Sequence, residues 1–156
     1  MRLREELTDY LEANIGSSYK NIREAYAVLE AEDTHDFDAK EYPLLEVIES
    51  STEILQCLDG KTNFHVSDMI LAVSVLVNNS QGRSRNPNVR ARAKTRKRTV
   101  DALAKEIEDT VDNLTFNING VYLQSSQLIN INEGEIDGDN STILQKVLTF
   151  KCSYNA

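Results

Sequence analysis

The sequence predicts an α+β domain in which two α-helices pack on one face of a mostly antiparallel β-sheet. Three observations lead to this prediction. Apolar residues recur at helical spacing in two stretches, residues 2–15 and 99–114. Alternating or continuous apolar residues, which are typical of strands, fill the stretches between and after them. The turns that join these strands are polar and short, and short connections favour antiparallel neighbours.

The first helix is predicted from apolar residues that recur at helical spacing, Leu3, Leu7, Tyr10, Leu11 and Ile15. Gly16 follows, and a glycine at this point is typical of a left-handed C-terminal cap. Residues 17–32 fit a helix or a strand, and we favour a strand. Residues 33–41 (DTHDFDAKE) are polar and acidic, which predicts a solvated loop.

Two or three antiparallel strands are expected next. Pro43 opens the stretch PLLEVIES, and proline is well tolerated at the first position of a strand. The stretches TEILQC and NFHVSDMILAVSVLVN follow, separated by the turn LDGKT. Nearly every residue of ILAVSVLV (residues 70–77) is apolar, so we expect this strand to be covered on both faces or contacted by a neighbouring subunit.

The second helix has the clearest period in the chain. Its apolar positions are Val100, Leu103, Ile107, Val111 and Leu114. Its start is open, because Asn86 and Pro87 form a good N-cap and first-turn pair well before residue 100. The basic residues between them lie either on early helical turns or in a long loop.

The last part of the chain is expected to form short strands. The stretches FNINGVYLQSSQLININEG and STILQKVLTFKCSY are separated by turns at Asn119–Gly120 and at residues 137–140. Apolar residues of one parity predict a half-buried final strand. They are Leu144, Leu148, Phe150, Cys152 and Tyr154.

The composition predicts one domain over residues 1–156 that folds in a cytoplasm. A chain of this length can bury a core without disulfides or metal. The longest apolar stretch, residues 69–77, is too short to span a bilayer, and the charged N-terminus does not resemble a signal peptide. Cys57 and Cys152 are expected to be reduced and buried. Two cysteines without a CxxC motif and two histidines do not supply a zinc site.

The sequence shows no catalytic signature, so we expect no enzyme, no catalytic residue, no cofactor and no metal. His65, in a predicted strand, is more typical of a surface or rim histidine than of a general base. Asp137 and Asp139 resemble the start of a calcium loop. However, the glycine between them falls one place early and no glutamate follows at the required distance, which favours a simple turn.

A segment with concentrated positive charge is the most unusual feature of the chain. Residues 81–98 (QGRSRNPNVRARAKTRKR) hold eight of the seventeen basic residues and no carboxylate, in a protein of net charge -8. Without these eight residues the charge falls to -16. They are Arg83, Arg85, Arg90, Arg92, Lys94, Arg96, Lys97 and Arg98. Positive charge at a helix start and carboxylates at its end both oppose the helix dipole, so this placement suggests interaction with a partner rather than local stability.

Three interpretations of this segment compete. It is a solvated loop, an arm that contacts nucleic-acid phosphates, or an arm that docks on an acidic protein surface. The segment has no aromatic residue to stack on bases, and the acidic remainder of the chain repels DNA. We therefore favour the protein surface, which includes an identical neighbour in a head-to-tail ring. The alternative is a small nucleic-acid-binding or DNA-packaging accessory protein that uses residues 83–98.

The order of elements resembles the tail terminator and tail completion proteins of long-tailed bacteriophages. The resemblance spans most of the chain. It is carried by the leading amphipathic helix, the proline-led strand YPLLEVIE, the long apolar strand MILAVSVLV, the helix TVDALAKEIEDTVDNL and the closing strand TILQKVLTFKCSY. Residues 17–41 and the basic segment, a loop or helix extension at about residues 79–98, fit the family least clearly.

The resemblance implies a structural virion protein without catalytic residues. Members of this family form a hexameric ring that caps the tail tube, ends its polymerisation and joins the tail to the neck of the head. The implied partners are identical subunits, the tail tube protein and neck or head-completion proteins, with no membrane. Genome DNA would pass through the ring without sequence-specific binding. The implied location is the head-tail junction of the virion, after assembly in the host cytoplasm.

Overall fold

The structure is a computed structural model, and it describes residues 2–29, 39–56, 63–78, 87–138 and 141–155. Its element order is helix, strands, helix, strands, as predicted. The helices are α1 (Arg2–Ile15) and α2 (Pro87–Val111), with two 3-10 turns, η1 (Gly16–Ser18) and η2 (Ala39–Glu41). The strands are β1 (Asn21–Ala25), β2 (Leu44–Gln56), β3 (Asn63–Asn78), β4 (Phe116–Ile118), β5 (Val121–Asp137) and β6 (Ser141–Asn155). Among the helices described, none is long and apolar enough to cross a membrane.

The strands described form one sheet in the order β1-β2-β3-β6-β5-β4. All neighbours are antiparallel except β1 and β2, which run parallel. The sheet is therefore mixed, and the prediction of a mostly antiparallel sheet holds for every pair but one. The long connection between Ala25 and Leu44 returns the chain to the end of the sheet from which β1 started, as a parallel neighbour requires.

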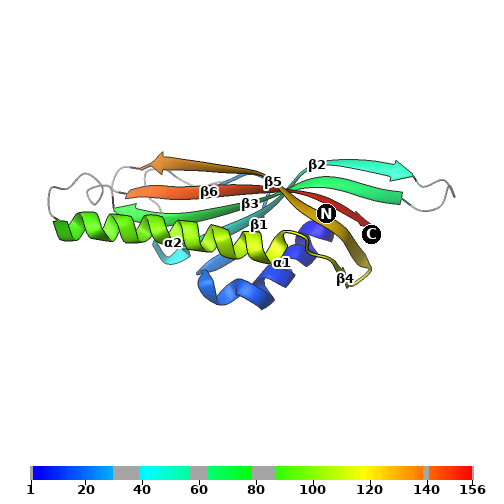
Figure 1. Cartoon of the computed structure of the whole chain (residues 1–156), viewed down its shortest axis with the longest axis horizontal. Coiled ribbons are helices and arrows are strands. Elements are labelled where there is room, and N and C mark those ends of the chain that lie inside the picture. Colours follow the sequence, from blue (N-terminus) through cyan, green and yellow to red (C-terminus); the bar gives the residue numbers. More distant parts are fainter. Residues whose placement is uncertain (1, 30–38, 57–62, 79–86, 139–140, 156) are drawn as a thin grey trace.

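Both helices cover the same face of the sheet, which confirms the predicted two-layer arrangement (Figure 1). The core between the layers contains fully buried Leu7 and Leu11 from α1, Ile107 from α2, and Leu71 and Phe150 from the sheet. The predicted cap at Gly16 is wrong. The helix runs directly into a 3-10 turn closed by the bond from Tyr19 N to Gly16 O (3.2 Å), and Gly16 does not adopt a positive φ.

The central strand β3 is buried on both faces along residues 71–75, as its continuous apolar sequence predicted. One face meets the helices. On the other face, Tyr42, Leu44 and Ile143 form a small second cluster with Leu76 packed against it. Tyr42, which precedes β2, therefore helps to bury the face of β3 that the helices do not cover.

Several predicted boundaries differ in the structure. Residues 44–56 form one strand with a bulge at Ser51, which has a φ of 24°. Of residues 17–32 only Asn21–Ala25 is a strand, and residues 30–38 lie outside the part described. The turn at Asn119–Gly120 is confirmed, with φ values of 51° and 81°. The expectation of short strands after it was wrong, because β5 and β6 are both long.

The molecule is elongated along the strand direction (Figure 1). The first half of α2 lies at one end of the long axis, next to the end of β5 and the start of β6. The β2–β3 hairpin extends from the opposite end, beyond the region that the helices cover. The two ends and the two sheet edges therefore present four different surfaces to partners.

Candidate interaction surfaces

The basic segment forms the first half of α2 where the structure describes it. The helix begins at Pro87, so the open question about its start is settled in favour of early helical turns. Six of the eight basic residues belong to this half-helix: Arg90, Arg92, Lys94, Arg96, Lys97 and Arg98. Arg98 is exposed. Arg83 and Arg85 lie outside the described residues.

Lys97 is bound within its own chain, in a network that ties α2 to the sheet. Its Nζ lies 3.2 Å from Glu133 Oε2 on β5 and 3.9 Å from Asp101 Oδ1 one helical turn on. Lys146 Nζ on β6 lies 3.0 Å from Asp101 Oδ1 and 3.1 Å from Glu133 Oε1. Hydrogen bonds from Lys146 and Lys97 lower the pKa of Glu133, and the bond to Asp101 contributes most to raising the pKa of Lys146. Lys97 therefore has a local role within its own chain.

The network borders a cavity of about 250 Å³ between α2 and the strands. Its walls include Lys97, Val100, Glu133, Leu144 and Gln145. Gly134 also borders it, and a Cβ added there would meet no atom within 4 Å. The cavity mixes charged and apolar walls, and the residues around it already pair with one another.

The acidic part of the helical layer, as opposed to the basic first half of α2, consists of α1 and the second half of α2. Glu5, Asp9 and Glu12 are exposed on α1. On α2, Lys105 pairs with Asp109 at 3.0 Å, and that helix has no basic residue in its last turn and no acidic residue in its first. The reversed charge order predicted for this helix is therefore present. The helical layer is basic at one end and acidic over the rest.

A half-buried carboxylate organises a second polar cluster, between β2, β3 and β6. Glu49 Oε1 accepts hydrogen bonds from Tyr154 Oη (2.7 Å) and Ser67 Oγ (2.8 Å). Burial and this carboxylate raise the pKa of Tyr154 above its ordinary value. His65 stacks on Tyr154 with ring centroids 4.9 Å apart and is partly exposed, in accordance with a rim position. The cluster fixes the hairpin against β6.

Exposed apolar side chains are confined to the two edges of the sheet. On the β1–β2 side they are Tyr26 (78% exposed), Ile54 (63%) and Leu55 (46%). On the β5 side they are Tyr122 (46%), Ile129 (52%) and Ile131 (43%). Among the described residues, these are the large hydrophobic side chains that face solvent. No sequence signal indicated their exposure, since the alternation in LININEGEI would place Ile129 and Ile131 on the covered face of a strand.

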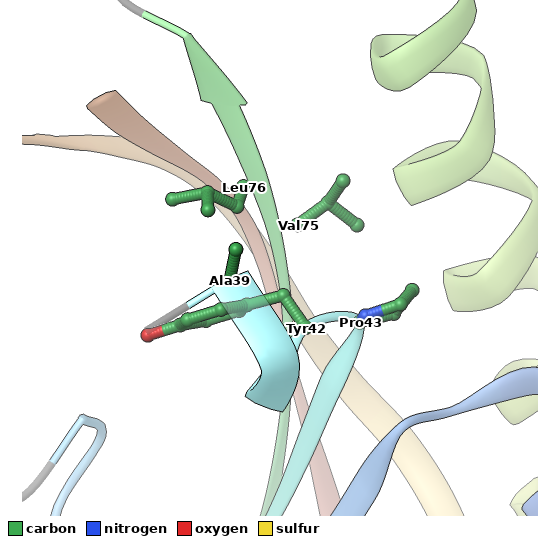
Figure 2. Close-up of a pocket in the computed structure, with 5 residues that line it drawn as sticks. All are labelled: Ala39, Tyr42, Pro43, Val75 and Leu76. Atoms are coloured by element: carbon green, nitrogen blue, oxygen red, sulfur yellow. The ribbon is translucent and has the colours of Figure 1, made fainter. Parts of the chain in front are cut away.

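A small cavity of about 100 Å³ lies on the sheet face opposite the helices (Figure 2). Figure 2 shows Tyr42 extending away from Pro43, with Ala39 and Leu76 beside its ring and Val75 on the far side. These residues are parts of the packing that covers β3. The cavity has the size of a packing defect rather than of a ligand site.

Neither candidate for metal chemistry forms a site in the described part of the chain. Gly138 N donates to Ser141 O (2.8 Å) and Thr142 Oγ1 donates to Asp137 Oδ1 (2.8 Å), which is the hydrogen bonding of a turn. Asp139 lies outside the described residues. Within them, no group of three or more His, Cys, Asp or Glu side chains is arranged to hold a metal ion. Cys152 is buried and free, whereas Cys57 lies outside the described residues.

Comparisons with known proteins assign no family to this chain. No protein family model matches the sequence, and no curated protein matches it. The chain is similar to a chain of the solved structure "Virion of native gene transfer agent (GTA) particle", with a TM-score of 0.48 and 10% identity over 99% of this chain and 91% of that chain. A likeness at this level assigns no function.

Proposed function

We propose that this chain is a structural virion protein of the tail-terminator type. In this proposal it forms a hexameric ring that caps the tail tube, ends tube polymerisation and joins the tail to the neck of the head. The proposal assigns it no catalytic activity, cofactor or metal. It is supported by the element order, which is the one that carries the family resemblance: leading helix, proline-preceded strand, long apolar strand, helix and closing strand.

The observation that carries the proposal is the position of the basic half-helix. Residues 87–98 lie at one end of the long axis, and the acidic remainder of the helical layer lies further along the molecule (Figure 1). In a ring whose axis runs along the strands, these half-helices would gather on one rim. A rim of six such helices fits an acidic surface of the next protein in the particle, the tube protein or a neck protein.

The position of nearby carboxylates favours a protein partner over nucleic acid. Glu133 and Asp101 already contact Lys97, and the exposed Glu135 and Asp137 follow on the same strand. Negative charges at this distance would repel phosphates as well as neutralise the helix. A protein surface can place acidic residues opposite the arginines and its own cations opposite these carboxylates, which a uniformly charged DNA backbone cannot do.

Charge reversal of the half-helix tests this function. With Arg90, Arg92, Arg96 and Arg98 all replaced by glutamate, we expect complementation of a deletion to fail, leaving heads and tails unjoined or tails of irregular length in electron micrographs. The matched control reverses Lys105 and Lys151, which are exposed on other surfaces, and should complement normally. Normal particles from the reversed half-helix would refute the docking role.

Duplex binding separates the nucleic-acid alternative from this proposal. We expect weak binding of purified protein to duplex DNA, lost by about 150 mM salt, because most of the molecule repels phosphates. Fluorescence anisotropy with a labelled 30-base-pair duplex at several salt concentrations measures it. Tight binding with a steep salt slope, lost in the glutamate variant, would favour the DNA-packaging accessory role instead.

A further inference from the structure

We propose that copies of this chain associate head to tail through the two edges of the sheet, with β5 of one copy beside β1 of the next. This inference supplies the lateral contact of the proposed ring and rests on that proposal for the cyclic arrangement. The partner that binds each sheet edge is a second copy of the same chain. Four observations on the described residues support it. Both edges have unpaired backbone, and the strand directions of the two edges are compatible. The exposed apolar residues of the two edges lie at matching positions along the strands, and so do the charged residues.

Both edges have unpaired backbone. On one side, β1 has β2 as its partner and covers only Leu44–Ile48, so the outer side of residues 49–56 has no described neighbour. On the other side, β4 covers Val121–Leu123, and Asn113 N and Asp112 Oδ1 bind Ser126 O and Leu128 N (2.8 and 3.0 Å), so the outer side is without a described neighbour only over residues 129–137. Residues 129–137 contain neither proline nor lysine, the residues that usually protect a free edge from pairing.

Strand direction makes the contact antiparallel. β1 and β2 run parallel to each other and to β6, and β5 is antiparallel to β6. Copies related by rotation about an axis along the strands keep their strand direction. Therefore β5 would meet β1 of the next copy in the antiparallel orientation, which is the commoner and slightly more stable pairing.

The exposed apolar residues of the two edges lie at the same positions along the strand direction, as the register of paired residues across the sheet shows. One row of paired residues across the sheet is Ala25, Ile48, Ile70, Thr149 and Asn130. Tyr26 follows this row at one edge, and Ile129 and Ile131 flank it at the other. A second row is Ile54, His65, Tyr154 and Leu123, with Tyr122 beside its last member. Copies at equal height in a ring would thus bring apolar residues of β5 and β1 together at the first row, whereas at the second row β4 lies outside β5 and forms the edge.

Charge follows the same register. A third row joins Asn21, Leu44, Ser74, Gln145 and Gly134. The exposed Lys20 precedes this row at one edge, and the exposed Glu133 and Glu135 flank it at the other. Glu133 already has two lysine partners, so Glu135 is the carboxylate available to Lys20 of the next copy. An unshifted contact therefore pairs opposite charges as well as apolar residues.

Engineered disulfides test the contact directly. In a background with Cys57→Ser and Cys152→Ala, the variants Tyr26→Cys and Ile129→Cys are prepared separately and together. We expect covalent dimers when the two single variants are mixed and oxidised, a ladder from the double variant, and little product from either single variant alone. The matched control pairs Ile129→Cys with Asp9→Cys, exposed on α1, and should give no ladder.

Charge exchange gives a second measurement that needs no cysteine. Lys20→Glu and Glu135→Lys should each weaken self-association roughly fivefold by sedimentation velocity, and the double variant should restore it. Covalent dimers of Tyr26→Cys alone, or a chain that stays monomeric and gives no ladder at millimolar concentration, would overturn edge pairing. These outcomes leave the proposed function standing, because that function is tested by where the protein lies in the particle.

Discussion

Glu46 is a fully buried carboxylate in β2, on the sheet face opposite the helices. Its Oε2 lies 3.2 Å from Arg23 Nη2 on β1, and its Oε1 accepts the backbone N–H of Leu29 at 2.7 Å. These contacts join the parallel strand β1 and the start of the following connection to β2. A buried charge of this kind is strongly destabilising when its counter-ion is removed.

Arg23→Ala should therefore lower the free energy of unfolding by about 3 kcal/mol, because the carboxylate stays buried while this cation is lost. Urea denaturation measures it, and a fall in Tm of roughly 6–12 °C should accompany it. The control Arg98→Ala removes an exposed arginine and should change stability by no more than about 0.5 kcal/mol. A loss below about 1 kcal/mol for Arg23→Ala would show that the pair does not hold the edge strand.

The buried thiol of Cys152 should make the free energy of unfolding depend on pH in the alkaline range. Burial raises the pKa of its thiol to about 11, from an ordinary value near 9, with Ser126 Oγ 3.6 Å from the sulfur. The unfolded chain ionises first, so stability is retained below about pH 9 and falls between about pH 9 and 11, by of the order of 2 kcal/mol. Burial raises the pKa values of Tyr19 and Tyr154 too, so they add loss of the same sign above about pH 10.

Urea unfolding at pH 8, 9 and 10, compared with Cys152→Ala, isolates the thiol contribution. The variant is less stable throughout, because it leaves a cavity, but its stability should change less between pH 9 and 10. Equal pH slopes for the two proteins would contradict the shifted thiol.

At the scale of elements, α2 carries its charges against its own dipole. Arg90→Glu in the first turn should raise the free energy of unfolding by about 0.3–1 kcal/mol, because a carboxylate is favourable there. Lys105→Glu in the second half should lower it by a similar amount, since it removes the pair with Asp109 and adds a negative charge near the helix end. Thermal unfolding in low salt measures both. A destabilised Arg90→Glu would mean that this arginine has a structural partner in its own chain.

The sequence predicted elements best where one face is buried at regular spacing. The period of Val100, Leu103 and Ile107 predicted α2 because all three side chains pack in the core. The start of α2 was left open, since the residues before 99 include few apolar side chains. The parallel pairing of β1 with β2 depends on tertiary contacts such as the buried Glu46, which looks like a solvent-facing residue in the sequence.

The candidate surfaces were predicted unevenly for a related reason. The basic half-helix was visible in the sequence because charge composition is a local property. The exposed apolar edges were not, because the exposure of Ile129 depends on β5 lying near the end of the strand order, with only the short β4 beyond it. The length of β5 was also missed, since an edge strand with one covered face shows only a weak alternation.

At the scale of the whole molecule, the surfaces divide by direction. The two sheet edges face sideways, where identical copies would lie in a ring, and the basic half-helix lies at one end of the long axis (Figure 1). In the proposed ring, lateral contacts would thus be apolar and antiparallel, and axial contacts would be electrostatic. Raised salt should weaken the joining of tail to head more than it weakens the ring itself, because exposed charge pairs are screened and buried apolar contacts are not.

The location of the protein in the particle tests the proposed tail-terminator function. Cryo-electron microscopy of particles from the cells that encode this chain, with an epitope tag at its C-terminus and bound antibody, shows where the protein lies. We expect one labelled site per particle, at the junction between head and tail. Intact particles without this protein, or label distributed along the tail or over the head, would contradict it.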